Sequence, residues 1–285
     1  MSTCSQTPPV VVYTPASKLA DPRNLFRSMV RDLALSRELA WRLFIRNISA
    51  RYRQTFFGYA WAIVIPIVTT GVFVFLQKSG YFAVGETQVP YSLFLLTGLV
   101  LWQVFVDAVQ APLRMVQQSS SILTKINFPR EALIIAAIGE VLFTFVIRLG
   151  LVVAALLWFG IGVSWTTIWS LVGVLILVGL GVAIGLLITP VAVLYHDIGQ
   201  VLPFALYLWM FLTPVIYPAP VSGSTLIQLN PATPVLDTTR AWLLSGSTDH
   251  LFGFFVVSCV TVFTILGGWL LYCVALPILI ERISA

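Results

Sequence analysis

Long apolar runs separated by short polar segments dominate the chain. The first run, Gly58 to Leu76, has 19 residues and no ionisable side chain except Tyr59. A helix of this length rises about 28 Å, which is close to the ~30 Å thickness of the hydrocarbon core of a bilayer. Five further runs follow, so the pattern predicts an all-α integral membrane protein with six transmembrane helices. The expected spans cover residues 58–76, 90–111, 132–159, 168–194, 200–217 and 254–280.

The segment before the first run carries apolar residues at helical spacing, with arginines away from them. It predicts an amphipathic helix over residues 23–57, or two helices broken near Ser36, along the cytoplasmic membrane surface. A simple lipid anchor and a helix that also touches a cytoplasmic protein both fit this pattern. Residues 1–22, rich in Pro, Ser and Thr, are expected to form a flexible cytoplasmic arm. The apolar positions are Phe26, Met29, Val30, Leu33, Trp41, Phe44, Ile45, Ile48 and Tyr52.

Residues 218–253 are too polar to cross a membrane and are interrupted by prolines. They are expected to form an outer loop in which Val235 to Leu244 make a short, half-buried helix against the outer membrane face. The six-span domain as a whole is expected to cover residues 58–285.

Charge is scarce and unevenly placed. The chain has 59% hydrophobic and 9% charged residues and a mean hydropathy of +0.96, far from the composition of soluble proteins. Nine of the sixteen Lys and Arg residues precede residue 54. With the N-terminus inside, thirteen lie in cytoplasmic segments, whereas the outer loops hold only Lys78 and Arg240. This bias predicts that both termini are cytoplasmic, and it indicates attraction to anionic lipid rather than to nucleic acid.

Motifs for ATP binding and secretion are missing from the sequence. It has no G-x-x-x-x-G-K-[ST] phosphate loop, so ATP-driven work would need a separate polypeptide that binds ATP and Mg²⁺. The chain itself is expected to hold no cofactor and no metal. The first thirty residues lack a signal peptide of the usual form, so the first span is expected to direct insertion.

The loop Ser119 to Glu131 (SSSILTKINFPRE) has the most specific local pattern. Lys125 and Arg130 flank the apolar Ile126 and Phe128, and Ser121 or Thr124 could cap a short helix. The proline after Phe128 favours an extended turn there. The loop is interpreted as a docking element for a cytoplasmic protein; a plain basic turn between two spans is the alternative.

Three charges lie inside predicted spans and therefore need partners: Asp107, Glu140 and Arg148. Glu140 and Arg148 are eight residues apart and share one side of a helix, which favours an ion pair or interhelical clamp over a proton relay. His196 and Asp197 are the only adjoining histidine and acid. Because no Ser or Cys nucleophile is near them, they are interpreted as the cap of a helix that begins at Ile198 rather than as a catalytic pair.

Aromatic side chains are abundant in the first and fifth spans. Membrane-interface belts or core packing explain most of them. A path for sugars is the alternative, because the apolar faces of sugars stack on aromatic rings. The candidates for a sugar-facing role are Phe57, Tyr59, Trp61, Phe75, Tyr207, Trp209, Phe211 and Tyr217.

Four stretches together resemble the permease subunit of the polysaccharide-exporting ABC transporters of type 2, which move O-antigen, capsule or teichoic acid chains. Ile48 to Pro66 resembles the family's R-Y-R-x-x-x-x-G-x-x-W-x-x-x-x-P start of the first span, and Leu123 to Glu131 resembles its loop before the third. His196 to Pro218 resembles its D-I and S/T-P-V-I-Y segment. Leu229 to Leu244 resembles its N-P loop and outer helix.

The resemblance implies a homodimer of six-span subunits in the bacterial inner membrane, bound to two copies of an ATP-binding subunit and exporting a lipid-linked polysaccharide. The fifth span and the outer loop would form the closing end of a continuous channel. His196 stands where the family usually has Arg. The implied ATPase-coupling residues are Arg42 and Arg46 of the amphipathic helix and Leu123, Lys125, Ile126, Asn127, Phe128, Pro129 and Arg130 of the loop.

Two other functions fit parts of the pattern. A type-2 ABC exporter of a drug or small lipid would share the same architecture. An integral-membrane enzyme acting on lipid-linked sugars would need acid or histidine clusters at a membrane face, and only His196 with Asp197 comes close to that requirement.

Overall fold

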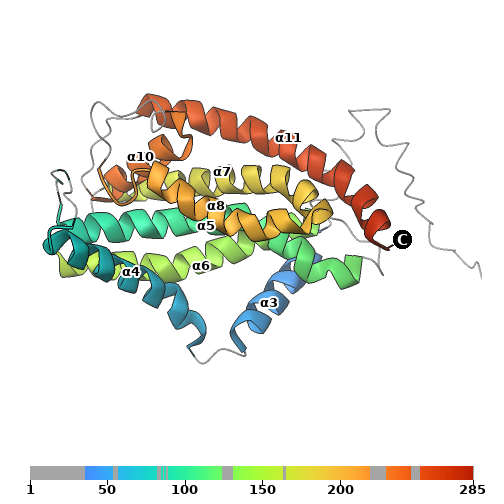
Figure 1. The fold of residues 1–285 in the computed structure, drawn as a ribbon, viewed down its shortest axis with the longest axis horizontal. Coiled ribbons are helices and arrows are strands. Elements are labelled where there is room, and N and C mark those ends of the chain that lie inside the picture. The colour runs from blue at the N-terminus through green and yellow to red at the C-terminus, as the bar shows by residue number, and fades with distance from the viewer. Residues whose placement is uncertain are drawn as a thin grey trace, which may run out of the picture.

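A computed structural model describes residues 36–53, 57–81, 85, 87, 89–123, 131–162, 165–218, 229–244 and 251–284. These residues form helices and no strand, so the protein is an all-α membrane protein as the sequence predicts. The long helices run roughly along one axis as an elongated bundle (Figure 1). The elements are α3 (Arg37–Arg53), the 3-10 turn η1 (Gly58–Ala60), α4 (Trp61–Lys78), α5 (Tyr91–Leu123), α6 (Glu131–Trp158), α7 (Thr166–Leu194), α8 (His196–Leu212), α10 (Ala232–Leu244) and α11 (Leu251–Ser284).

Five of these helices are long and apolar enough to cross a membrane: α4, α5, α6, α7 and α11. The predicted fifth span corresponds to α8, which has only 17 residues. In Figure 1, α8 nevertheless runs back along part of the bundle. The six-span count and the division into arm, interface helix and span domain stay predictions, since residues 1–35 lie outside the described part of the chain.

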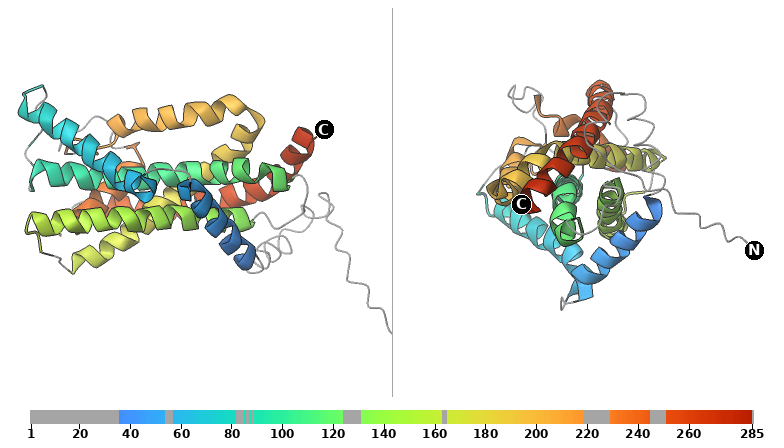
Figure 2. Two further views of the ribbon diagram at one scale, coloured as in Figure 1. Left: turned by 90° about the horizontal axis from the view of Figure 1, so that it is seen from below. Right: turned by 90° about the vertical axis from the view of Figure 1, so that its right-hand side faces the viewer.

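The helix α5 forms the interior of the bundle. Of its apolar stretch 78% is buried, compared with 11% for α4, and it packs against α4, α6, α7, α8 and α10. Seen along the bundle axis, α5 lies near the centre, whereas α11 and α4 lie at the periphery (Figure 2). Helices at the periphery of a membrane protein present their exposed apolar side chains to lipid.

Small residues of α7 allow it to lie directly against α5. A methyl group added at Gly181 would come within 2.6 Å of Ala108 Cβ and 2.9 Å of the Phe105 carbonyl oxygen. One added at Gly185 would overlap the Val109 carbonyl oxygen. Helices in lipid associate largely through such close van der Waals packing, because lipid tails are as apolar as the side chains they would replace.

The ends of α5 and α8 differ from the predicted boundaries. Span 90–111 was expected to end in a polar segment, but α5 continues for 33 residues to Leu123, about 50 Å. Polar residues such as Gln117 are compatible with a helix. The polar pattern therefore indicates a change in the expected surroundings of the chain and not the end of the helix. Ser121 is consequently inside α5 and does not cap a new helix.

The helix α8 begins at His196, not at Ile198, after the extended residue Tyr195 (φ −117°, ψ 103°). No side chain caps its start, so the capping role predicted for His196 and Asp197 is wrong. Asp197 lies in the first turn, where a negative charge favours the helix dipole. The helix ends at Leu212 because Thr213, which precedes Pro214, is extended (φ −109°, ψ 140°).

The close approach of α7 to α5 predicts a large effect of a single methyl group. Gly185→Ala should lower the free energy of unfolding by about 1–3 kcal/mol, because the added carbon overlaps the Val109 backbone and α7 must shift. Gly71→Ala in α4, where nothing lies within 4 Å, is the matched control and should cause no loss. The midpoint of thermal unfolding in mild detergent measures both; equal midpoints would contradict the packing described here.

Candidate functional site

At the end of the bundle where α3 lies, a buried asparagine attaches α3 to two other helices. The Asn47 side-chain amide donates to Glu140 Oε1 of α6 at 3.0 Å and to Met115 Sδ of α5 at 3.1 Å. Asn47 shares the buried side of α3 with Ala40 and Leu43. A displacement of α3 therefore acts on α5 and α6 through polar contacts as well as apolar ones.

The apolar stripe predicted on α3 is divided between two sides of the helix. Phe44 packs onto Gly139 and lies edge-to-face with Phe143 of α6, at 6.1 Å between ring centroids. Trp41 and Ile45 are instead exposed. This arrangement leaves one apolar side for the bundle and another at the surface of the protomer.

The two arginines predicted to couple to an ATPase have different surroundings. The Arg42 side chain is exposed and pairs with Glu38 one turn earlier at 2.6 Å. Arg46 instead donates to Asn47 Oδ1 at 3.1 Å and to Ser119 Oγ of α5 at 3.5 Å. Only Arg42 thus extends away from the bundle.

The predicted docking loop lies mostly outside the described residues. This applies to Lys125, Ile126, Asn127, Phe128, Pro129 and Arg130, and only the helix position of Leu123, at the end of α5, is described. The residue after the loop, Glu131, is buried at the start of α6 and accepts a hydrogen bond from Cys273 Sγ of α11 at 3.4 Å. The loop is therefore attached directly to α5 and α6, and its coupling role stays a prediction.

Two of the three predicted intramembrane charges form an ion pair that joins α5 to α6. Arg148 Nη1 lies 2.7 Å from Asp107 Oδ2. Arg114, one to two turns further along α5, approaches Asp107 Oδ1 at 3.6 Å and donates to the Asp107 backbone oxygen at 3.2 Å. Glu140 does not join this pair, since its carboxylate accepts from Asn47 instead. The arrangement is an interhelical clamp with two arginines around one carboxylate.

The aromatic candidates also fall into two groups. In α4 and the turn before it, Phe57, Tyr59, Trp61 and Phe75 are all more than 40% exposed. Trp209 of α8 points inward, with its ring edge-to-face to Trp102 at 6.3 Å and to Phe105 at 5.5 Å. Trp209 is therefore a core residue of the protomer.

The other aromatic candidates of α8 lie on its outer side and at its end. Tyr207 and Phe211 are exposed and contact each other edge-to-face at 5.5 Å. The Tyr217 hydroxyl donates to the Phe211 carbonyl oxygen at 2.9 Å. A sugar-facing role for any of these rings stays a prediction.

The broken end of α8 is held by side chains from three other places in the chain. The Asn230 amide donates to the Leu212 carbonyl oxygen at 3.2 Å, and the Tyr91 hydroxyl donates to that of Ile216 at 3.1 Å. Arg240 donates to the Pro214 carbonyl oxygen at 3.0 Å. The last carbonyls of a helix lack intrahelical partners, so Asn230 satisfies that of Leu212, while Tyr91 and Arg240 hold the residues that follow α8. Residues 213–217 are here named the outer corner.

Arg240, which the charge count places in an outer loop, is buried beneath this corner. It pairs with Asp237 one turn earlier and lies over the Phe94 ring at 3.8 Å from the centroid. Burial lowers the pKa of the Arg240 guanidinium, and the Asp237 carboxylate raises it. Gly98 leaves room for the corner, because a methyl group there would lie 2.7 Å from the Val215 carbonyl oxygen.

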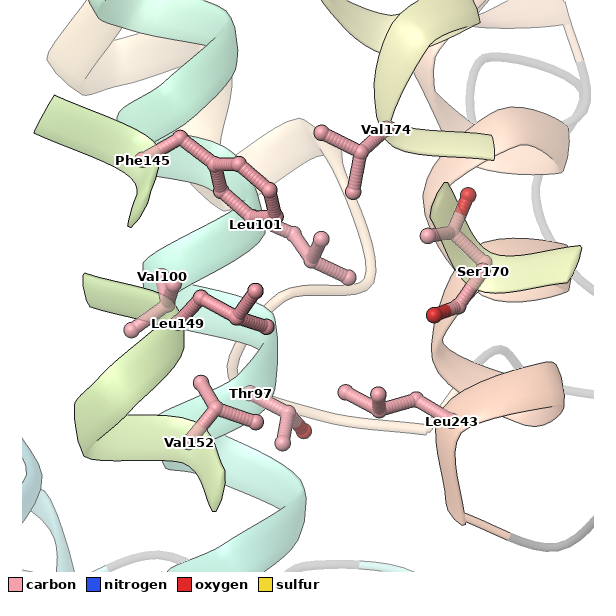
Figure 3. Close-up of a pocket in the computed structure, with 10 residues that line it drawn as sticks. Thr97, Val100, Leu101, Phe145, Leu149, Val152, Ser170, Val174 and Leu243 are labelled. Atoms are coloured by element: carbon pink, nitrogen blue, oxygen red, sulfur yellow. The ribbon is translucent and has the colours of Figure 1, made fainter. Parts of the chain in front are cut away.

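A cavity of about 20 Å³ lies between α5, α6, α7 and α10 (Figure 3). Its lining includes Thr97, Leu101, Phe145, Ser170 and Leu243. A space of this size holds about one water molecule, so it is not a site for a sugar. Among the described residues, no three His, Cys, Asp or Glu side chains are grouped so that they could hold a metal ion.

The family model for ABC-2 type transporters matches residues 38–244, from the first turn of α3 to the end of α10. The chain belongs to the ABC-2 type transporter family. Among curated proteins it is similar to the O-antigen export system permease protein RfbA of Myxococcus xanthus, 27% identical over 75% of this chain and 83% of that protein. A protein of the same name from Klebsiella pneumoniae is 24% identical over 72% of this chain and 80% of its own length.

The ABC-2 family match includes the polar contacts at both ends of the bundle, several of which the sequence did not reveal. Asn47 gave no signal, because a single polar residue on an amphipathic helix is ordinary. Arg240 did have a sequence signal. Asp237 and Arg240 are three residues apart in an otherwise apolar segment, a spacing that puts both on one face of a helix. Asn230 directly precedes Pro231 at the start of α10, a position where its side chain can bond to backbone groups.

The ion pair in this ABC-2 protein generates a prediction for a double-mutant cycle. Arg148→Leu alone should lower the free energy of unfolding by about 3–5 kcal/mol, because it leaves the Asp107 carboxylate in the bundle without its closest partner. The double variant Asp107→Leu with Arg148→Leu should recover most of that loss, since no uncompensated charge remains. Thermal unfolding in mild detergent measures the cycle.

The exposed pair of Glu38 and Arg42 is the matched control. A cycle at this pair should give a coupling of at most about 0.5 kcal/mol, because solvent screens it. Equal couplings at the two pairs would contradict a buried clamp between α5 and α6.

Proposed function

We propose that this ABC-2 protein is the channel-forming membrane subunit of an ATP-driven exporter that moves a lipid-linked, O-antigen-like polysaccharide across the bacterial inner membrane. The observation that carries the proposal is the similarity to O-antigen export permeases over about three quarters of the chain. The family match over α3 to α10 supports the transporter class independently of those names.

In this proposal the functional unit contains two copies of the chain and two copies of an ATP-binding subunit, which holds the ATP and Mg²⁺. The exposed Arg42 and the loop between α5 and α6 would contact that subunit. A movement of Arg42 and of this loop would reach the bundle through Asn47, which donates hydrogen bonds to Glu140 and Met115. The chain itself would carry out no hydrolysis.

The architecture favours a transport path between two copies of the chain over a path through a single copy. The protomer encloses a cavity with room for about one water, whereas a glycan needs a continuous path. The weakly packed α4 and the outer side of α8 expose apolar and aromatic side chains that a second copy could cover. The path would then lie between the two copies.

Deletion of the gene in its host tests the proposal. Surface polysaccharide should disappear, and the finished glycan should accumulate on its lipid carrier inside the cell, because synthesis continues without export. A plasmid carrying the wild-type gene should restore both. Gel analysis of surface polysaccharide and mass spectrometry of extracted lipid-linked glycan measure the two pools.

Other outcomes of the deletion would contradict the proposal. Unchanged surface polysaccharide, with sensitivity to a drug, would favour an exporter of drugs or small lipids. Loss or shortening of the lipid-linked glycan itself would instead indicate an enzyme that builds or modifies it.

A further inference from the structure

The partly exposed positions of α5 form one polar stripe. From Leu93 to Ser119, nearly every side chain of this helix is buried inside the protomer. The exceptions are Gln103, Val106, Asp107, Gln110, Arg114, Gln117 and Gln118, of which only Val106 is apolar.

These positions share one side of the helix. Successive residues of an α-helix are about 100° apart, so the seven side chains fall within an arc of about 120°. Gln103, Gln110 and Gln117 lie about two turns apart from one another. Their three amide groups are therefore distributed along about 21 Å of the helix. This stripe, from Gln103 to Gln118, is named the amide stripe.

The amide stripe is unlike the lipid-facing surface of the same protein. The exposed positions of α11 are apolar, for example Val260 and Phe263. Amide and charged side chains are costly in hydrocarbon and usually face a bundle interior or water. A polar stripe on the one open side of the central helix is therefore not explained by contact with acyl chains.

The stripe is open at its cytoplasmic end and closed at its outer end. Gln117 and Gln118 are exposed near the end of α5. On the same side of the helix, nearer the outer end, Leu96 and Leu99 are buried. The outer corner packs on a different side of α5, where the Val215 carbonyl oxygen lies over Gly98.

The chemistry of the stripe suits a hydroxyl-rich, uncharged chain. A glutamine amide both donates and accepts hydrogen bonds, which matches the hydroxyl groups of a sugar. The one acid, Asp107, is compensated by Arg148 and Arg114, so the stripe presents little net negative charge. Within the described part of the chain, the side chains of Gln103 and Gln110 bond to no other residue.

We propose that the amide stripe of α5 is the sugar-contacting lining of the cytoplasmic half of the export path. This inference rests on the proposed function and gives it a surface: the glycan is held by amide hydrogen bonds along α5. In this proposal the sugar contacts come from the amides of α5, and the exposed aromatic rings of α4 and α8 do not replace them.

Cysteine accessibility tests the stripe without any glycan. Single cysteines replace Gln103, Gln110 or Phe263 in a full-length chain without Cys4, Cys259 and Cys273, expressed with its ATPase. Phe263 is the matched control, because it lies twelve residues from the outer end of α11, as Gln103 does from that of α5. The probe is a charged methanethiosulfonate reagent added to inside-out membrane vesicles.

The cysteines at 103 and 110 should react at least about tenfold faster than the one at 263, because thiols react as thiolates in water and not in lipid. Rates as low as that at 263 would overturn the inference. Rapid formation of a disulfide between two copies through position 110, without reagent labelling, would also overturn it, since the stripe would then be a subunit interface.

A second readout separates sugar contact from mere hydration. The double variant Gln103→Leu with Gln110→Leu should lower the export of surface polysaccharide by roughly tenfold, because two hydrogen bonds to the glycan are lost. Val260→Leu, on the exposed apolar side of α11, should export normally. Normal export by the double variant would overturn the sugar contact. If the cysteines at 103 and 110 are labelled but deletion of the gene leaves surface polysaccharide unchanged, the proposed function is refuted. The stripe would then be a water-accessible surface without a role in sugar binding.

Discussion

The contact between α5 and α7 is the constraint on which the remaining structure depends. Gly181 and Gly185 bring the α7 backbone against the turns of α5 that carry Ala108 and Val109. In lipid, where apolar burial gives little net drive, such close packing supplies much of the association between helices. Because α7 covers one side of α5 closely, α6 and α10 can cover others. One polar side of the helix then remains open.

Polar side chains fix the two ends of this central pair in different ways. At the end where α8 stops, Asn230, Arg240 and Tyr91 hold the carbonyls of Leu212, Pro214 and Ile216, and Arg240 is itself buried and paired. At the opposite end, α3 is attached mainly through Asn47 and packing around Leu43. Several side-chain hydrogen bonds thus attach the outer corner to α5 and α10. Fewer such bonds attach α3, at the end that would receive an ATPase. Motion that begins at α3 would reach the outer corner through α5 and α6.

The sequence predicted the helices well where hydropathy decides them. The bounds of α6 and α7 lie within two residues of the predicted spans, because both runs are predominantly apolar and end at polar or turn residues. The bounds of α5 and α8 were missed for a physical reason: hydropathy reports the surrounding solvent, while helix ends follow backbone geometry. Thus α5 continues through Gln117 into water, and α8 stops at Thr213 because a proline follows.

The candidate site was predictable only in part. The charges Asp107 and Arg148 were recognisable, because an ionised group in a span needs a partner, but the identity of the partner depends on which helices pack together. The spacing of Asp237 and Arg240 indicates their pairing, but the bond from Arg240 to the Pro214 carbonyl depends on how α10 packs against the end of α8. The amide stripe required the burial pattern of α5, since its glutamines are scattered among apolar residues and become one surface only when the other sides of the helix are covered.

The central claim is that this ABC-2 chain works as the membrane half of an ATP-driven exporter, and the composition of its native complex tests it most directly. Native mass spectrometry of the complex, gently extracted from its own membrane, should find two copies of this 31.4 kDa chain with two copies of an ATP-binding protein. A monomer or homodimer that is stable without any ATPase would contradict the claim.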